Sequence, residues 1–111
     1  MKSLDSMKTL LIGWTTTENR TDAEQLAKHF IEKQWVVCAQ IEGPINSLYR
    51  WESKIENTQE YRLTLKFFSN NKDNVHKCLL ENHPYETPQW VVIEAAHVDP
   101  DYFAWVVEQQ A

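Results

Sequence analysis

The chain has 111 residues, with 16 acidic side chains against 11 basic ones and a formal net charge of −5. This length predicts a single domain that can bury a hydrophobic core without disulfides or metal ions. The acidic balance disfavours nucleic acids and anionic membranes as partners, and no apolar run approaches the roughly 20 residues of a membrane-spanning helix.

The first half of the chain predicts a strand, a helix and a long extended segment. Residues 8–15 form a short apolar run, which is typical of a buried strand. Thr21 and Glu24 have the spacing of a capping box, and apolar residues behind them recur on one helical face, so we expect a helix that runs to about Lys33. Residues 35–51 then have an extended pattern, interrupted at Gly43-Pro44.

The second half predicts a strand, a helix, a strand and a short terminal helix. From Ile55 onward apolar and polar residues alternate strictly, which indicates a strand with one buried face. Residues 71–82 form a weaker helical pattern with Val75, Cys78 and Leu79 inward, and residues 90–97 indicate a fourth strand. Asp99 followed by proline has the signature of an N-cap that opens the last helix.

The order βαββαβ plus a terminal helix predicts an α+β protein with a ferredoxin-like antiparallel sheet and helices on one face. In that topology the second and fourth strands lie at the edges, yet residues 90–93 are apolar on both faces. Residues 35–51 extend to roughly 55 Å, whereas a compact globule of this length is about 35 Å across. We therefore expect the hairpin to overhang its own domain and to pair with other copies in a homo-oligomer.

Two further patterns bear on location. Residues 1–7 contain Lys2 and Asp5 but no apolar stretch, unlike a secretory signal. Cys38 and Cys78 form no CxxC pair and are too few for a disulfide scaffold. We expect a cytoplasmic protein with reduced thiols, made of a disordered tail over residues 1–7 and one domain over residues 8–111.

The segment His83-Pro84-Tyr85-Glu86-Thr87-Pro88, called the proline motif below, carries the densest chemistry of the chain. Its two prolines restrict the backbone and disfavour helix in the residue before each of them. A histidine, a phenol and a carboxylate are therefore presented from a stiffened connector. The alternative interpretation is a helix stop followed by a turn.

Several spaced motifs resemble those of the CutA divalent-cation-tolerance proteins, from about Lys8 to Val107. They are Trp35-Val36-Val37-Cys38-Ala39-Gln40, Gly43-Pro44-Ile45-Asn46-Ser47-Leu48-Tyr49-Arg50-Trp51, Ile55-Glu56, Leu65-Lys66, the proline motif and Tyr102-Phe103-Ala104-Trp105. The resemblance implies a ferredoxin-like protomer related to PII signalling proteins, assembled as a tight homotrimer. It also implies a link to tolerance of divalent metals, especially copper.

The chain departs from the family pattern at informative positions. Gln40 stands where the family usually has Asn, and Ser53 stands where it has Gly, which predicts a different turn at the hairpin tip. Some members carry a cysteine and two adjacent histidines assigned to copper, and here those positions correspond to Trp14 and Asn82-His83. His83 is therefore the one metal-ligand candidate, for copper or another divalent cation.

The remaining site candidates are polar and aromatic residues in the segments that carry the resemblance. The predicted ligand-binding residues are Tyr49, Trp51, Lys66, Tyr85, Glu86 and Trp105. Glu86 is a candidate partner for the Lys66 ammonium, and the hairpin of one subunit is expected to lie against the proline motif of another. The alternative is an inter-subunit network that only holds the trimer together.

Three functions compete at this point. The first is a trimeric, non-enzymatic protein of metal tolerance that binds metal or a small ligand at inter-subunit clefts, with a PII-like sensor or scaffold as its metal-free version. The second is an enzyme that uses His83 as acid or base, although no nucleophile, phosphate loop or metal triad is evident. The third is an RNA-binding module, which lacks a basic surface and the glycine-containing motif on its third strand.

Overall fold

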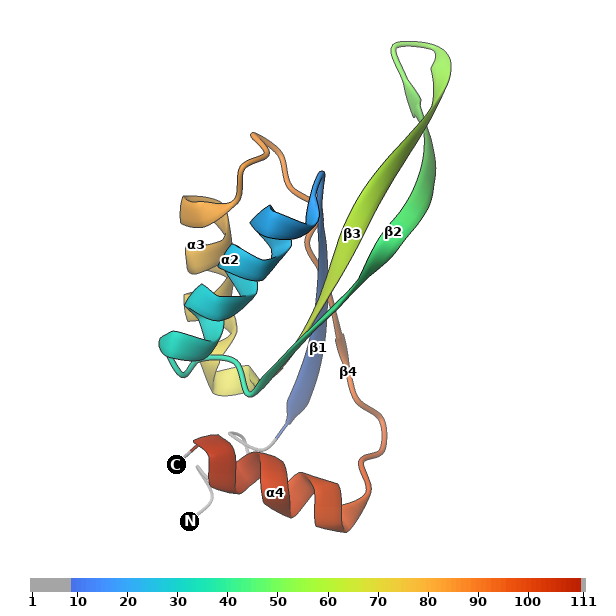
Figure 1. Ribbon diagram of the computed structural model, residues 1–111. Coiled ribbons are helices and arrows are strands. Elements are labelled where there is room, and N and C mark those ends of the chain that lie inside the picture. The colour runs from blue at the N-terminus through green and yellow to red at the C-terminus, as the bar shows by residue number, and fades with distance from the viewer. Residues whose placement is uncertain (1–8, 111) are drawn as a thin grey trace.

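The computed structural model describes residues 9–110, so the tail predicted over residues 1–7 lies outside the described residues. The elements are β1 (Leu10–Thr17), α2 (Arg20–Glu32), β2 (Cys38–Trp51), β3 (Lys54–Phe68), the 3₁₀ helix η1 (Ser69–Asn71), α3 (Lys72–Asn82), β4 (Val91–Glu94) and α4 (Pro100–Gln110). They form an antiparallel four-stranded sheet in the order β2-β3-β1-β4 (Figure 1). The predicted ferredoxin-like α+β fold is confirmed, with β2 and β4 at the edges.

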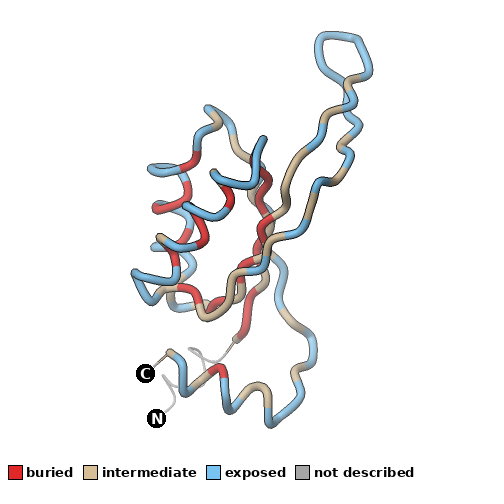
Figure 2. Tube along the Cα trace, viewed as in Figure 1, coloured by how far each residue is buried: buried red, intermediate tan, exposed pale blue. Residues whose placement is uncertain are grey.

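The main core lies between the sheet and the two helices that cover one of its faces, α2 and α3 (Figures 1 and 2). The alternation predicted for β3 is confirmed, because Leu63, Leu65 and Phe67 are fully buried against these helices. A smaller cluster joins Phe68 to Val106 of α4, which packs at one end of the sheet. Among the described residues, no helix combines the length and apolar character needed to cross a bilayer.

The capping box predicted at Thr21 is wrong, because α2 begins earlier. Asn19 is the N-cap, and its Oδ1 accepts the backbone N–H of Asp22 at 2.8 Å. Thr17 fixes this cap by donating its hydroxyl to the Asn19 carbonyl at 2.8 Å. Asparagine is at least as good an N-cap as threonine, so the earlier start is favoured. The cap predicted at Asp99 is confirmed, since its Oδ2 accepts the N–H groups of residues 101 and 102.

The β2–β3 hairpin projects well beyond the helices as an arm (Figure 1). The molecule measures 52 × 26 × 21 Å, and its radius of gyration of 15.3 Å exceeds the roughly 13 Å expected for a compact chain of this length. At the tip Trp51 pairs with Lys54, leaving a two-residue turn. Glu52 and Ser53 both have positive φ, 49° and 68°. Ser53 thus adopts the left-handed conformation that glycine takes freely, and a turn different from that of the family stays a prediction.

The fourth strand is shorter than the predicted residues 90–97 and spans only Val91–Glu94. It pairs with β1 over residues 11–14, after which the chain turns away toward α4. Val91 and Ile93 stay about half exposed on this free edge. One face of β4 is covered within the chain, because Val92 packs against the main core, whereas the apolar side chains of Val91 and Ile93 on the other face are not covered.

Candidate functional site

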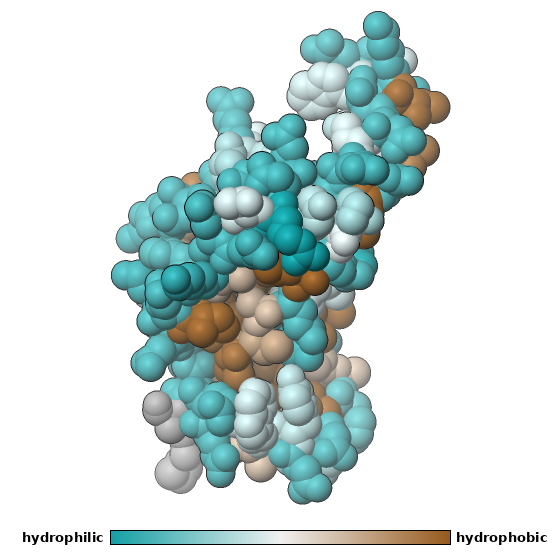
Figure 3. All heavy atoms as spheres, in the orientation of Figure 1, coloured by the Kyte–Doolittle hydropathy of each residue, from teal (hydrophilic) through white to brown (hydrophobic). Residues whose placement is uncertain are grey.

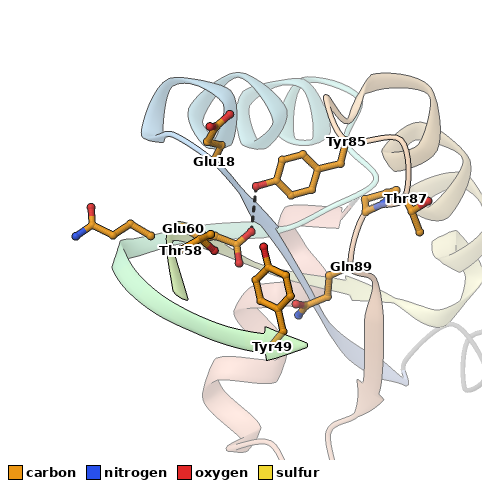
Figure 4. Close-up of a pocket in the computed structure, with 9 residues that line it drawn as sticks. Glu18, Tyr49, Thr58, Glu60, Tyr85, Thr87 and Gln89 are labelled. Atoms are coloured by element: carbon orange, nitrogen blue, oxygen red, sulfur yellow. Dashed lines mark hydrogen bonds between the residues drawn. The ribbon is translucent and has the colours of Figure 1, made fainter. Parts of the chain in front are cut away.

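A cleft of about 850 Å³ lies between the base of the arm and the proline motif (Figure 4). Its lining comes from the end of β1, both strands of the arm and the loop that precedes β4. The lining residues are Glu18, Tyr49, Thr58, Gln59, Glu60, Tyr85, Thr87, Pro88 and Gln89. Segments that are far apart in the chain therefore meet here.

His83 anchors one end of the proline motif to the sheet. Its backbone N–H donates to the Leu79 carbonyl and ends α3, because the following proline disfavours further helix. Its ring is buried, with Nε2 at 2.9 Å from the Thr16 carbonyl and Nδ1 accepting the Tyr85 N–H at 3.0 Å. The proton therefore resides on Nε2, and burial lowers the pKa of His83 below its usual value, which keeps the ring neutral.

Trp90 anchors the other end of the same loop. Its indole stacks on Phe67, with ring centroids 6.0 Å apart, and covers Gly13 of β1. A Cβ added at Gly13 would lie 2.5 Å from the Trp90 ring, so only glycine lets the indole pack this closely. The loop is thus fixed on the sheet at both of its ends, and Tyr85 is held over the cleft.

Tyr85 and Glu60 form the polar contact at the centre of the cleft. The phenol donates to Glu60 Oε2 at 3.0 Å (Figure 4). Burial raises the pKa of Tyr85, and the hydrogen bond to Glu60 and the negative charges of Glu60 and Glu18 raise it further. The phenol therefore stays protonated and acts as a hydrogen-bond donor.

Four of the six predicted ligand-binding residues come together here. Tyr49 and Tyr85 line the cleft, and an adjoining hollow of about 530 Å³ is lined by Trp51, Glu86 and Glu56 together with the same two tyrosines. These aromatic rings and carboxylates form one continuous groove along the arm. The cleft and this hollow are called the arm groove below.

Lys66 and Trp105 do not belong to the arm groove. Lys66 Nζ lies 3.3 Å from the Tyr102 hydroxyl and 5.2 Å from the centre of that ring, and Trp105 stacks on the same ring. Lys66 is six residues beyond Glu60 on β3, a distance of about 20 Å along a strand. The Lys66–Glu86 pair is therefore not made within one chain, because the lysine is fixed at the opposite end of the sheet.

The donors among the residues that the structure describes do not fit a divalent metal site within one chain. Both ring nitrogens of His83 are engaged by the backbone, which leaves no lone pair for a metal. The Asn82 amide donates to the Cys78 carbonyl, and Cys78 is buried in the core as its apolar neighbours predict. Across residues 9–110, no three His, Cys, Asp or Glu side chains are grouped to hold a metal ion. The metal role predicted for His83 gains no support from this geometry.

Glu18 and Glu60 are the principal groups that sequence reasoning missed. The alternation from Ile55 onward puts Glu60 on the polar face of β3 but indicates no partner for it, because Tyr85 is 25 residues away. Glu18 follows β1 directly and precedes the Asn19 cap. The available signal was the fold itself: in this strand order the end of β1 lies beside the middle of β3, where Thr17 pairs with Tyr61.

Comparison with known proteins shows the relationship directly. Residues 11–109 match the family described as CutA1 divalent ion tolerance protein. A divalent-cation tolerance protein CutA of Escherichia coli is 31% identical over 101 residues, covering 91% of this chain and 90% of the relative.

Solved structures agree with the sequence match. The divalent ion tolerance protein CutA1 of Ehrlichia chaffeensis superposes with a TM-score of 0.89 and 29% identity, covering 96% and 99% of the two chains. A periplasmic divalent cation tolerance protein CutA of Archaeoglobus fulgidus gives 0.85 and 27%, covering 92% and 99%. The chain therefore belongs to the CutA family of divalent ion tolerance proteins.

Proposed function

We propose that this protein acts in divalent-cation tolerance as a homotrimer that binds a small ligand in the arm groove and carries out no catalysis. The observation that carries the proposal is the arm itself. Leu48, Trp51 and Ile55 are 65%, 61% and 75% exposed near its tip, on both faces of the hairpin. Figure 3 shows hydrophobic atoms along one edge of this otherwise largely hydrophilic region, and a second copy would cover them.

Assembly through the arm also accounts for the free edge of β4. Val91 and Ile93 expose apolar side chains beside unpaired backbone groups, a combination that single domains normally avoid. If the arm of one copy packed against the sheet of another, the exposed apolar residues of the arm and of the β4 edge would be covered together. The arm groove would then lie at or near the contact between subunits, as expected for an inter-subunit ligand site.

The geometry does not favour the enzymatic alternative. His83 was the candidate acid or base, but its ring is buried and both nitrogens are held by the Thr16 carbonyl and the Tyr85 N–H. A proton shuttle needs a nitrogen that can reach a substrate. Nucleic-acid binding is disfavoured as well, because the described lining of the groove carries carboxylates and no basic side chain.

Copper is the metal whose tolerance we expect this protein to affect. We do not expect one chain to bind it in a complete site. The cytoplasm is the proposed location, supported by free cysteines at positions 38 and 78. Because a relative has been described as periplasmic, cell fractionation is the appropriate check of location.

The test combines assembly with tolerance in an Escherichia coli strain that lacks its own relative of this chain. Wild type is expected to restore growth in excess Cu²⁺ and to sediment as a trimer. Leu48→Ser is expected to weaken both, whereas Leu80→Ser, which alters a similarly exposed leucine on α3 at 58%, should change neither. Full complementation by a variant that sediments as a monomer would contradict the proposal.

A further inference from the structure

We propose that the arm groove binds a protonated organic amine, held between carboxylates and tyrosine rings. This inference names the ligand class of the site proposed above. It rests on the charge, the aromatic surface and the size of the groove, which are set within one chain.

The charge of the groove favours a cation. Among the described residues that line the two hollows, Glu18, Glu56, Glu60 and Glu86 are acidic and none is basic. The nearest cation on the same face of β3, Arg62, is bound through Nε and a terminal nitrogen to Glu42 at 3.0 and 2.9 Å. Its charge is therefore already balanced by Glu42, and it does not neutralise Glu60.

The aromatic surface favours an organic cation over a bare metal ion. Tyr49 and Tyr85 contribute to both hollows, and Figure 4 shows their side chains on either side of Glu60. The face of a phenol ring attracts an ammonium group and also packs against its alkyl stem. A hard metal ion instead needs several oxygens converging at about 2–2.6 Å, which the described residues do not group.

The contact between Tyr85 and Glu60 orients the carboxylate for such a ligand. The phenol holds Oε2, so Oε1 is left to accept hydrogen bonds from a bound ammonium. Because Tyr85 keeps its proton, the phenol adds no negative charge of its own to the groove. It also holds the Glu60 carboxylate in place throughout the pH range in which an alkylamine is positively charged. The amine requires no covalent step.

The size of the groove favours a ligand larger than a single ammonium group. The cleft has a volume of about 850 Å³ and the adjoining hollow about 530 Å³. Both volumes lie in the range of pockets that bind small organic molecules. Acidic side chains occur at both ends of the groove, from Glu18 near the sheet to Glu56 on the arm. Glu18 and Glu60 both act on the Tyr85 hydroxyl, so a short diamine would place one ammonium group near each of these two carboxylates.

The test is calorimetric titration of the full-length protein with 1,4-diaminobutane at low salt, with 1,4-butanediol as the neutral isostere and Cu²⁺ as the metal arm. We expect the diamine to bind and the diol not to bind. Glu18→Gln and Glu60→Gln should each weaken binding by about fivefold, in line with a partly exposed ion pair. Glu32→Gln, which makes the same change in charge at the far end of α2, should leave it unchanged.

Three results would overturn the inference: equal binding of diamine and diol, absence of diamine binding at millimolar concentration, or Cu²⁺ binding that depends on Glu60 while the diamine does not bind. Sedimentation and copper tolerance are measured on the same variants. If the protein is a trimer and restores copper tolerance but does not bind the diamine, only this inference is wrong. If the protein binds the diamine but is a monomer and does not restore copper tolerance, only the proposed function is wrong.

Discussion

The two halves of β3 show how differently one strand can be used. Its second half ends in Leu63–Phe68, which is covered by α2 and α3 on one face and lies in the core, whereas its first half begins with Lys54–Asn57, which forms the outer part of the arm and is largely exposed. Both halves are equally regular strand and both pair with β2. Strand formation is thus set locally by pattern and pairing, while burial depends on what is available to cover the strand.

This contrast predicts that the same kind of truncation has different consequences at the two ends. In the covered half, Phe67→Ala removes a fully buried ring that stacks on Trp90, and should lower the free energy of unfolding by about 3–5 kcal/mol. Urea unfolding at fixed protein concentration measures this loss. A loss below about 1 kcal/mol would show that the core is not organised as described.

In the arm, Trp51→Ala or Tyr49→Ala should weaken assembly while the single-chain fold persists. A ring buried between subunits costs about 3 kcal/mol on truncation, which lowers the association constant by roughly a hundredfold. Sedimentation on dilution measures the shift, and circular dichroism follows the fold. Variants that keep full trimer mass at every dilution would contradict this role of the arm.

Between the two halves, His83 ties the proline motif to the sheet and gives stability a pH dependence. Its pKa is lowered in the fold mainly by burial, so the unfolded chain binds the proton more tightly. Stability from this group is therefore complete above about pH 6.5 and is lost as pH falls below that value, with a slope of at most about 1.4 kcal/mol per pH unit. His83→Asn should flatten the profile between pH 6.5 and 5, even if it is less stable at neutral pH. Parallel profiles of wild type and variant would refute the assignment.

The tip of the arm should give the smallest effect and one of opposite sign. Ser53 has a φ of 68°, which costs a non-glycine residue about 1–2 kcal/mol. Ser53→Gly relieves this cost but makes the unfolded chain more flexible, so a net gain of about 1 kcal/mol or less is expected. Thermal unfolding measures it. Ser47→Gly, within β2, is the matched control and should destabilise.

The sequence predicts most of the covered half and four residues of the groove, but not the contact at the centre of the groove. Alternation identifies β3 and its buried residues, and the length of residues 35–51 predicts the overhang, since both depend on local pattern. The Tyr85–Glu60 contact depends on strand register and on how the loop is anchored by Gly13 under Trp90. Those relations arise only when distant segments pack, so Glu60 was placed on a face without a role, and Lys66 was grouped with a motif that lies at the other end of the sheet.

One copy of the chain leaves the arm and the β4 edge uncovered, and we propose that three copies associate to cover them. Sedimentation equilibrium of the full chain at micromolar concentration tests it most directly. We expect a particle of three chain masses that resists dilution. A soluble, fully folded particle of one chain mass, 13.1 kDa, would contradict it.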